Sequence, residues 1–375
     1  MPPKPVYDFI PGLPPVTNDA VEAAVESVRA GGVEAAVWDA HLDARIGQLR
    51  SDPGFGQRVR EVFDDAGVTL VSPTVMGTDP RLDFAEGVYR DLTRWSARFD
   101  LLDWMQRVTS PEQARRVVDD GDVGVILNTQ NLGAFTDGDL RAVDELFDAG
   151  VRSMQLTYNH QNAIGAGCTE PSGSGLSNHG VAAVERLNDL GAIVDCSHCN
   201  RETTLDAVAV SDAPIAFTHT HCGALVNNAR AKSDAEIEAL ADVDGYMGVL
   251  VYPTLYDEPT FDTFFEHFEH AVSILGLDNV GVSTDWGMTT PDVPESMRPG
   301  LLSYWRAATG MTEDAAEYDA LTLDTFEEPF GPFRTYDQRS VIREAFERRG
   351  YSRSTIDGVL GENFLDFWER VRAAR

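Results

Sequence analysis

Lysine is almost absent from this chain, and positive charge is scarce. Its 375 residues include lysine only at Lys4 and Lys232, and 30 basic residues stand against 61 acidic ones, which gives a formal net charge of -31. A surface of this sign repels DNA, RNA and anionic lipid. We therefore expect neither nucleic acid nor a membrane as a partner.

The acidic residues are spread along the chain and do not gather in a tail, which disfavours a disordered acidic arm. Abundant acid with little lysine is typical of proteins from a high-salt cytoplasm, where screening relieves the self-repulsion of the folded chain. The charge therefore predicts a halophilic protein. This prediction concerns habitat and not chemistry.

Long apolar runs are missing as well. No segment reaches the roughly 20 apolar residues that span a bilayer, and the first residues, MPPKPVYDFIPGLPP, lack the charged and apolar regions of a secretory signal. The expected location is the cytoplasm, where cysteines stay as thiols. Residues 196–199 form a C-x-x-C pattern without a second pair at zinc-finger spacing, so a structural zinc knuckle is the weaker alternative. The cysteines are Cys168, Cys196, Cys199 and Cys222.

Short apolar runs alternate with amphipathic stretches along the chain, a pattern that predicts strands joined by helices. The stretches 41–66 and 81–120 are expected to be largely helical. Candidate strands occupy 7–10, 33–40, 68–75, 123–131, 151–159, 193–198, 215–221, 245–253 and 280–287. Helical spacing is found at 18–32, 139–150, 181–191, 201–211, 234–243 and 263–276.

This order favours a closed parallel (β/α)8 barrel, the TIM barrel, because each parallel step needs a helical crossover. An open doubly wound sheet is the alternative, and the lack of a Gly-x-Gly-x-x-Gly fingerprint after the first strand speaks against it. We predict one domain over 1–375. Amphipathic helices at about 337–375 would pack outside the barrel, and 288–336 would form a decorated connection or lid.

Two of the candidate strands end in histidine. The runs IVDCSHCN (193–200) and IAFTHTHCG (215–223) carry His198 and His219 at their ends. The carboxyl ends of parallel strands meet at one face of a barrel, so the two imidazoles are expected to lie close together and to bind a metal. The alternative is that each histidine is only hydrogen-bonded at a strand end.

Other polar side chains follow the same strand ends: Gln130, Asn131, Tyr158, Asn159, His160, His221, Tyr252 and Asp285. Two imidazoles with an amide oxygen and a carboxylate would hold a divalent ion and leave one position open for water. Water there would lose its proton near neutral pH, and Asp285 would accept that proton as a general base. Arg230 would grip a substrate carboxylate with its planar guanidinium.

Each of these residues has a second interpretation. His160 and His221 are expected to face solvent or to support the site without binding metal. Asp285 would serve equally well as the cap of a following helix. Arg230 would otherwise form a surface ion pair.

The segment from MQLTYNHQNAIGAGC to RETTLDAV, followed by PIAFTHTHCGALVNNARAKSDAEIEAL, strongly resembles the membrane (renal) dipeptidase family of metallopeptidases. The resemblance continues through VGVSTDW and GENFLDFW and covers roughly 122–370. It implies a (β/α)8 barrel that binds two divalent ions, usually zinc, and hydrolyses dipeptides. It also implies that His198 and His219 hold one metal, that Arg230 binds the substrate carboxylate and that Asp285 manages the proton.

The chain departs from the family pattern at three places. The family's first strand ends in Asp-Gly-His-x-Asp, whereas residues 8–12 read Asp-Phe-Ile-Pro-Gly, so both ligands of the other metal are missing. Gln130 stands where the family has a glutamate that bridges the metals, and Tyr158 stands where a histidine polarises the scissile carbonyl. Tyr158 could still donate a hydrogen bond to an oxyanion. We expect a divergent prokaryotic member of the family with one divalent metal, most simply zinc.

The predicted activity is hydrolysis of a dipeptide or a related small amide with a free carboxylate. His198, His219 and Gln130 are assigned to the metal. Asp285 and Tyr158 are assigned to catalysis, and Arg230, Asn159 and Tyr252 to substrate binding. Two alternatives stay open, a barrel that binds a small carboxylate ligand without hydrolysing it and an enzyme of different chemistry on the same scaffold. A homodimer is also left open.

Overall fold

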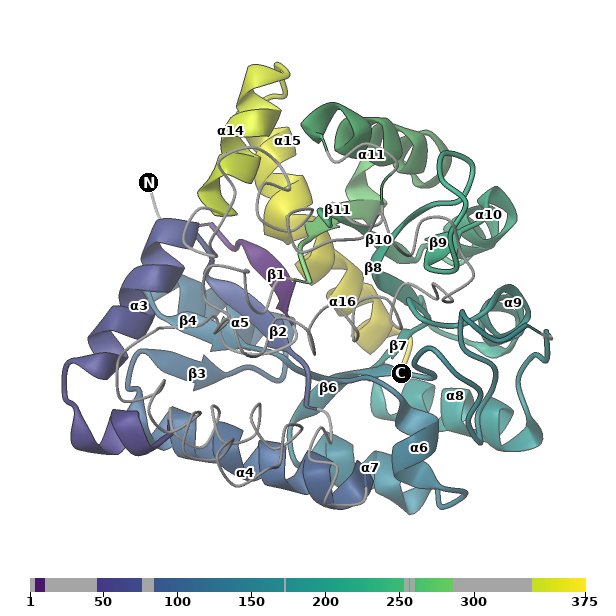
Figure 1. The fold of residues 1–375 in the computed structure, drawn as a ribbon, viewed down its shortest axis with the longest axis horizontal. Helices are drawn as coiled ribbons and strands as arrows, with labels where there is room; N and C mark the ends of the chain where they lie inside the picture. Colours follow the sequence, from purple (N-terminus) through teal and green to yellow (C-terminus); the bar gives the residue numbers. More distant parts are fainter. Residues whose placement is uncertain are drawn as a thin grey trace, which may run out of the picture.

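The structure is a computed structural model that describes residues 4–10, 46–75, 84–171, 173–252, 256, 260–285 and 339–375. Three predictions lie outside these residues, namely the helix at 18–32, the strand at 33–40 and the connection at 288–336. In the described part, parallel strands occupy the centre, and helices surround them (Figure 1). None of the described helices is both long enough and apolar enough to cross a membrane.

The strands pair in parallel in two series that follow their order along the chain. The first series is β1-β2-β4 and the second is β5-β6-β7-β8-β10-β11. Only Ile126 separates β4 from β5, so together they form one strand position and join the two series. Their bounds are β1 Tyr7–Ile10, β2 Leu70–Pro73, β4 Val123–Val125, β5 Leu127–Thr129, β6 Val151–Gln155, β7 Ile193–Asp195, β8 Ala216–Cys222, β10 Tyr246–Leu250 and β11 Val280–Ser283.

Hydrogen bonds between the last strand and the first close the sheet into a barrel. The backbone N–H of Asp285, just after β11, donates to the carbonyl of Phe9 in β1 over 3.0 Å. At the junction of the two series, a parallel bridge joins Thr74 to Asn128. Eight strand positions of the described residues therefore form a closed parallel barrel, and the predicted (β/α)8 fold is confirmed.

Helices connect and cover these strands. Several begin at a side chain that accepts the exposed N–H of the first turn, such as Ser177 before α8 and Asn200 before α9. Their bounds are α3 Phe55–Ala66, α4 Phe84–Leu101, α5 Pro111–Asp119, α6 Leu132–Thr136, α7 Arg141–Asp148, α8 Asn178–Leu190, α9 Arg201–Val210, α10 Asp234–Asp242, α11 Phe261–Leu275, α14 Val341–Arg348, α15 Arg353–Asp357 and α16 Asn363–Ala373.

The stretch 81–120 is largely helical, as predicted, through α4 and α5. It also contains β3 (Met105–Arg107), which pairs with β4 at the side of the barrel and was not predicted. The single strand predicted at 123–131 was wrong in detail, because it is divided into β4 and β5. Segments of three to five residues are too short to show a periodic pattern. Another short strand, β9 (Ala231–Lys232), pairs in parallel with the last two residues of β8.

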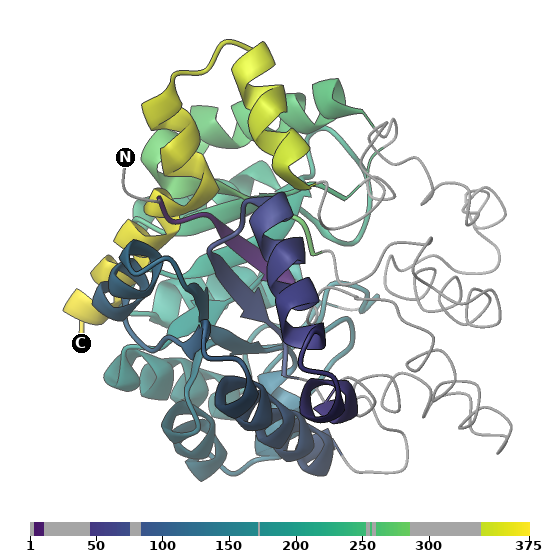
Figure 2. The same cartoon turned by 90° about the vertical axis from the view of Figure 1, so that its left-hand side faces the viewer.

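The last helix, α16, lies against the end of the barrel where the strands begin, whereas α14 packs on α11 through Phe346 (Figure 2). Residues from the starts of several strands, Tyr7 and Tyr246 among them, form one apolar cluster with the buried side of α16. The ring of Phe364 in α16 stacks on Tyr7 at a centroid distance of 3.7 Å and meets Tyr246 edge-on at 5.5 Å. This end of the barrel is thus closed by aromatic packing, and the site must lie at the other end.

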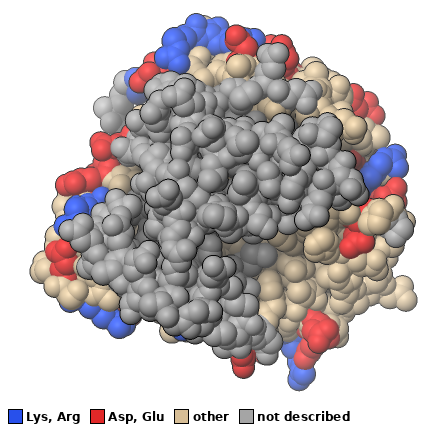
Figure 3. Space-filling view, viewed as in Figure 1, with Lys and Arg blue, Asp and Glu red and all other residues tan. Residues whose placement is uncertain are grey.

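Acidic side chains are interspersed with fewer basic ones around the rim of the face seen in Figure 3. Many of the basic side chains form ion pairs, and the pair between Arg339 and Asp8 is among the buried ones. Arg339, which begins the last described segment, donates from Nε to Asp8 Oδ2 over 2.8 Å, and both side chains are almost completely excluded from solvent. Asp8 also accepts from the backbone N–H and the hydroxyl of Thr284, at 3.0 and 2.9 Å. Asp8 therefore links β1, the end of β11 and the carboxyl-terminal segment.

We expect Arg339→Met to destabilise the fold strongly, because it removes a buried guanidinium that pairs with the buried Asp8 carboxylate. The expected loss is about 3–5 kcal/mol of unfolding free energy, measured by chemical denaturation in high salt. Arg348→Met is the matched control. It breaks the exposed pair with Glu344 and should cost no more than about 0.5 kcal/mol. Equal losses in the two variants would show that the buried pair does not hold the barrel closed.

Candidate active site

The structure brings the two predicted histidines together at the carboxyl end of the barrel. His198 lies in the loop that follows β7, and His219 lies within β8, the neighbouring strand. Their Nε2 atoms are 3.1 Å apart, and both side chains are buried. The pairing follows from the fold, because the carboxyl ends of β7 and β8 are neighbours in the sheet.

Hydrogen bonds at Nδ1 fix the protonation of both rings. His198 Nδ1 is 2.7 Å from the side-chain oxygen of Asn159, which can only accept, so Nδ1 carries the proton. His219 Nδ1 is 2.8 Å from Thr218 Oγ1. The Thr218 hydroxyl donates its own hydrogen to Asp195, so it accepts from His219. Both Nε2 atoms are therefore unprotonated, and each directs its lone pair toward the other ring.

Two facing lone pairs at this distance repel unless a cation lies between them. His198 and His219 would hold a divalent ion through these two nitrogens, which are donor atoms that zinc commonly takes in proteins. Burial, with a smaller contribution from the positive charge of Arg230, holds the pKa of both imidazoles well below its ordinary value. The pair is thus neutral at physiological pH, as a metal ligand must be. These donors fit one divalent metal.

Arg230 lies next to this pair and bonds to the backbone of both segments that carry the histidines. It precedes β9, and its guanidinium donates from Nη1 to the carbonyl of Ser197 and from Nη2 to the carbonyl of His219, the second over 3.0 Å. Its side chain is buried. The surface ion pair considered as an alternative is therefore wrong. The guanidinium is fixed in orientation beside both histidine-bearing segments, which suits a planar carboxylate-binding group.

Asp285 stands at the end of β11 with a backbone φ of 52°, in the left-handed region that aspartate tolerates better than most residues. Burial raises the pKa of its carboxyl to about 7, with Arg230 opposing the rise and Asp8 adding to it. The carboxyl of Asp285 thus interacts electrostatically with Arg230, so the two lie in one neighbourhood. Its suggested role as a helix cap concerns residues outside the described ones.

Tyr158 and Asn159 both contact His198. The Tyr158 ring stacks on the imidazole at a centroid distance of 4.4 Å. Asn159 accepts the hydrogen bond from Nδ1 of His198 that is described above, so it contacts a candidate metal ligand. Whether Asn159 also contacts substrate, as the sequence suggested, stays a prediction.

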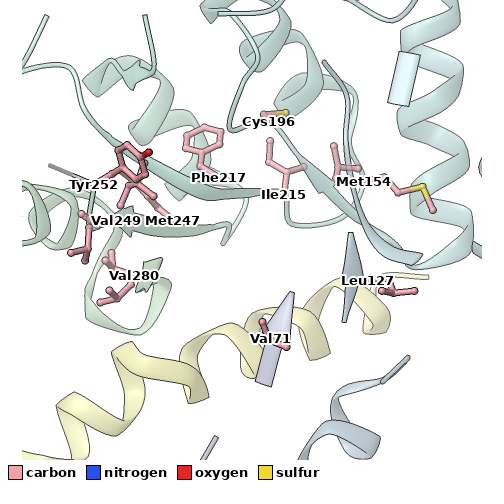
Figure 4. Packing of buried hydrophobic residues seen from close by; sticks show 14 of the residues in the cluster. Val71, Leu127, Met154, Cys196, Ile215, Phe217, Met247, Val249, Tyr252 and Val280 are labelled. Carbon is pink, nitrogen blue, oxygen red and sulfur yellow. The ribbon is translucent and has the colours of Figure 1, made fainter. Parts of the chain in front are cut away.

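Gln130 and Tyr252 are both buried. Gln130 follows β5, and its side-chain nitrogen is 3.4 Å from Thr74 Oγ1. Tyr252 follows β10 and belongs to the same apolar cluster as Val249 and Met247 (Figure 4). In the part of the chain that the structure describes, no group of three or more His, Cys, Asp or Glu side chains is placed to share a metal. Among the described residues, the amide oxygen of Gln130 is a candidate for a third protein ligand.

The ring of Phe9 covers one face of His219. Their centroids are 4.1 Å apart with only 13° between the planes, and Phe9 is completely buried. Phe9 belongs to the first strand, the segment that carries metal ligands in the family described above. An apolar ring thus lies against the histidine pair on the side of β1.

The other two histidines differ from each other. His160 is exposed, which agrees with the solvent-facing interpretation. His221 is buried, with its Nε2 3.0 Å from the side-chain oxygen of Asn228, so the solvent-facing interpretation is wrong for it. It lies near Tyr256 and His267, at centroid distances of 5.8 Å from each.

Sequence reasoning missed two groups around the histidine pair. Asp195, the last residue of β7, binds the Thr218 hydroxyl and so reaches His219. Lys232 donates to the carbonyl of Cys199, next to His198, over 2.7 Å. An aspartate that directly ends an apolar run was the one available signal for the first. The signal for Lys232 was weaker, namely that it is one of only two lysines in the chain.

A closed parallel barrel with an imidazole pair at its carboxyl end has the architecture of metal-dependent hydrolases. A sequence model of one such family, described as membrane dipeptidase (peptidase family M19), matches residues 15–298. The chain belongs to this family of metallopeptidases, and the resemblance seen in the sequence is confirmed.

Two known relatives are 25% and 30% identical to this chain over the segments that align with it. A fission yeast (Schizosaccharomyces pombe) protein named uncharacterized dipeptidase C965.12 is 25% identical over 260 residues, which make up 67% of this chain and 54% of that protein. The chain thus spans about half the length of this relative. Dipeptidase verJ of Clonostachys rogersoniana is 30% identical over 146 residues, 38% of this chain and 37% of that protein.

Solved structures show the same fold. An amidohydrolase from Pseudomonas aeruginosa has a TM-score of 0.68 and 25% identity, with 84% of this chain and 93% of that chain covered. A metallopeptidase from Rhodobacter sphaeroides, bound to a phosphinate mimic of the dipeptide L-Ala-D-Ala, has a TM-score of 0.66 and 15% identity, with 98% and 99% covered.

Lys232 ties the loop of His198 to the neighbouring helices. Its ammonium, almost completely buried, also donates to Thr204 Oγ1 in α9 over 2.8 Å and to Glu236 Oε1 in α10 over 3.2 Å. Glu236 in turn accepts from the backbone N–H of Ser233 over 2.9 Å and so caps α10. All three donor hydrogens of the ammonium are therefore used.

We expect Lys232→Met to lower the unfolding free energy by about 3–5 kcal/mol, because it leaves the Glu236 carboxylate buried and unpaired. The double variant Lys232→Met with Glu236→Gln should recover part of this loss, since the amide keeps the helix cap and carries no charge. Lys4→Met is a natural control. Lys4 is exposed and pairs with Glu362, so its replacement should cost less than about 1 kcal/mol. A double variant no more stable than Lys232→Met would contradict this assignment.

Proposed function

We propose that the protein is a metal-dependent hydrolase that cleaves a dipeptide or a related small amide with a free carboxylate. The observation that carries the proposal is the pair of unprotonated Nε2 atoms of His198 and His219, 3.1 Å apart at the open end of the barrel. Membership of the membrane dipeptidase family supports the reaction class. The phosphinate dipeptide mimic bound by the Rhodobacter sphaeroides relative supports the substrate class.

Each residue of the site has a role that its environment suits. A divalent cation between the two imidazoles would polarise the scissile carbonyl and make water acidic. Asp285 would accept the proton of the attacking water, a task for which a carboxyl with a raised pKa is suited. Tyr158, stacked on His198, would donate a hydrogen bond to the developing oxyanion. Arg230, held by two carbonyls, would bind the substrate carboxylate.

We infer that one ion per chain does this work, where the family pattern has two. The residues at the family's first-strand ligand positions are Ile10 and Gly12, which have no donor side chain. Phe9 presents a hydrocarbon ring to His219, and Gln130 offers a neutral amide in place of a bridging carboxylate. A single ion with an open position suffices for amide hydrolysis, because it can polarise a carbonyl and acidify water together.

A barrel that only binds a small carboxylate ligand is the second candidate. Gln130 favours it, because a neutral amide holds zinc less firmly than the carboxylate of an Asp or Glu at the same position would. Both candidates use Arg230. They differ in whether a bound metal turns over substrate.

The metal prediction is one zinc per chain after loading and desalting, measured by elemental analysis. His198→Ala and His219→Ala should each abolish the bound zinc, whereas His160→Ala, which removes an exposed imidazole, should keep it. With zinc at about 100 times its Kd, binding should stabilise the parent chain by roughly 2.7 kcal/mol. The two site variants should gain nothing. Unchanged zinc content in both would place the metal elsewhere.

The catalytic prediction concerns Asp285. If its carboxylate is the general base, kcat/KM on a dipeptide panel rises with pH until this group is ionised. Burial raises the pKa of Asp285 to about 7, and a nearby cation would lower it. The increase in kcat/KM with pH should therefore occur at or below neutral pH. Asp285→Asn should reduce kcat by about 10²–10⁴-fold and remove this limb of the profile while zinc content stays at one. Zinc binding without turnover in the parent chain would favour the second candidate.

A further inference from the structure

Asp195 is a buried carboxylate that ends β7 directly below the histidine pair. It is 1% exposed and accepts four hydrogen bonds. Its Oδ1 receives the backbone N–H of Ser197 at 2.9 Å, the Ser197 hydroxyl at 2.5 Å and the backbone N–H of Thr218 at 3.3 Å. Its Oδ2 receives the Thr218 hydroxyl at 2.5 Å. Burial raises the pKa of this carboxyl, and the hydrogen bonds from Ser197 and Thr218 oppose that rise. With four donors around it the group is assigned as a carboxylate, which can only accept.

The direction of these bonds decides which nitrogen of His219 carries a proton. The Thr218 hydroxyl has one hydrogen, and the carboxylate takes it. Toward His219 the same oxygen can therefore only accept, which requires a hydrogen on Nδ1, 2.8 Å away. The remaining nitrogen, Nε2, is then unprotonated and points at His198. Each step follows from an acceptor-only group at the start of the chain of bonds.

We propose that Asp195 acts through Thr218 as a positioning residue that keeps the Nε2 atom of His219 unprotonated and ready for a divalent cation. The proposal rests on the proposed function, since it specifies how one half of that metal site is prepared. A carboxylate commonly orients a metal-binding imidazole by direct contact. Here a threonine hydroxyl is interposed. The arrangement also places a full negative charge close to a pair of ligands that are themselves neutral.

Asparagine at position 195 should reverse the chain of bonds. Its amide nitrogen can turn toward Thr218 and donate, because the two backbone N–H groups at Oδ1 still require an oxygen on the other side. The threonine hydroxyl would then donate to His219 Nδ1, and the ring would carry its proton on Nε2. Replacement of aspartate by asparagine in serine-protease triads stabilises the wrong tautomer in the same way.

The test has two readouts, and neither depends on turnover. The first is the tautomer of His219 in the metal-free chain, read from long-range ¹H–¹⁵N correlation spectra of ¹⁵N-histidine-labelled protein. The second is zinc affinity, measured by competition with a chelator. The parent chain should show a proton on Nδ1. Asp195→Asn should move it to Nε2 and weaken zinc binding by about 10–100-fold.

Variants at Thr218 keep the test decisive if Asp195→Asn does not fold. Thr218→Ser preserves the hydroxyl and should keep both the tautomer and the affinity, whereas Thr218→Val removes the hydroxyl and should lose zinc affinity as Asp195→Asn does. Ser153→Ala is the matched control, because it removes a buried barrel hydroxyl that has no hydrogen-bond partner among the described residues. It should change neither readout.

Two results would overturn the proposal. The first is a parent chain in which His219 carries its proton on Nε2. The second is a set of Asp195 and Thr218 variants with unchanged tautomer and unchanged zinc affinity. Failure of the proposed function is a separate outcome, because a parent chain with the expected tautomer and zinc site but no turnover would leave this inference standing.

Discussion

The approach of two unprotonated imidazole nitrogens, His198 Nε2 and His219 Nε2, is the interaction on which the account of this site depends. Without a cation between them, two lone pairs at 3.1 Å raise the energy of the folded chain. A protein that holds them so close must fix the orientation of both rings. The hydrogen bonds from the two Nδ1 atoms to Asn159 and Thr218 do this. The stability of the surrounding structure thus prepares the site before any metal arrives.

Buried charges supply that support. Asp195 is bound by four donors, Arg230 spans two carbonyls, and Lys232 uses its three hydrogens on three different segments. Groups this deeply buried must be fully paired, because an unpaired charge in the interior costs several kcal/mol. Helix α16 closes the opposite end of the barrel, and Arg339 pairs with Asp8 where β1 meets β11. The carboxyl end of the strands is the end that is left for chemistry.

The barrel and the histidine pair could be predicted from the sequence, because alternating strands and helices are a local pattern and strand ends must meet at one face. The family could also be predicted, from the motifs that this sequence shares with membrane dipeptidases. The strand β3 and the helix α6 could not be predicted, since three to five residues show no period. Asp195 and Thr218 are ordinary residues for the end of a strand. Their importance lies in the direction of hydrogen bonds that exist only after β7 and β8 have paired, and the Asp8–Arg339 pair joins positions at opposite ends of the chain.

The most direct measurement is the anomalous diffraction of crystals of the zinc-loaded protein, recorded at the zinc absorption edge. The account predicts one strong peak per chain, about 2.0–2.1 Å from the Nε2 atoms of both His198 and His219. A second peak of equal height beside Gln130 would contradict the single-ion site. Two imidazoles with no peak between them would contradict the metal site altogether.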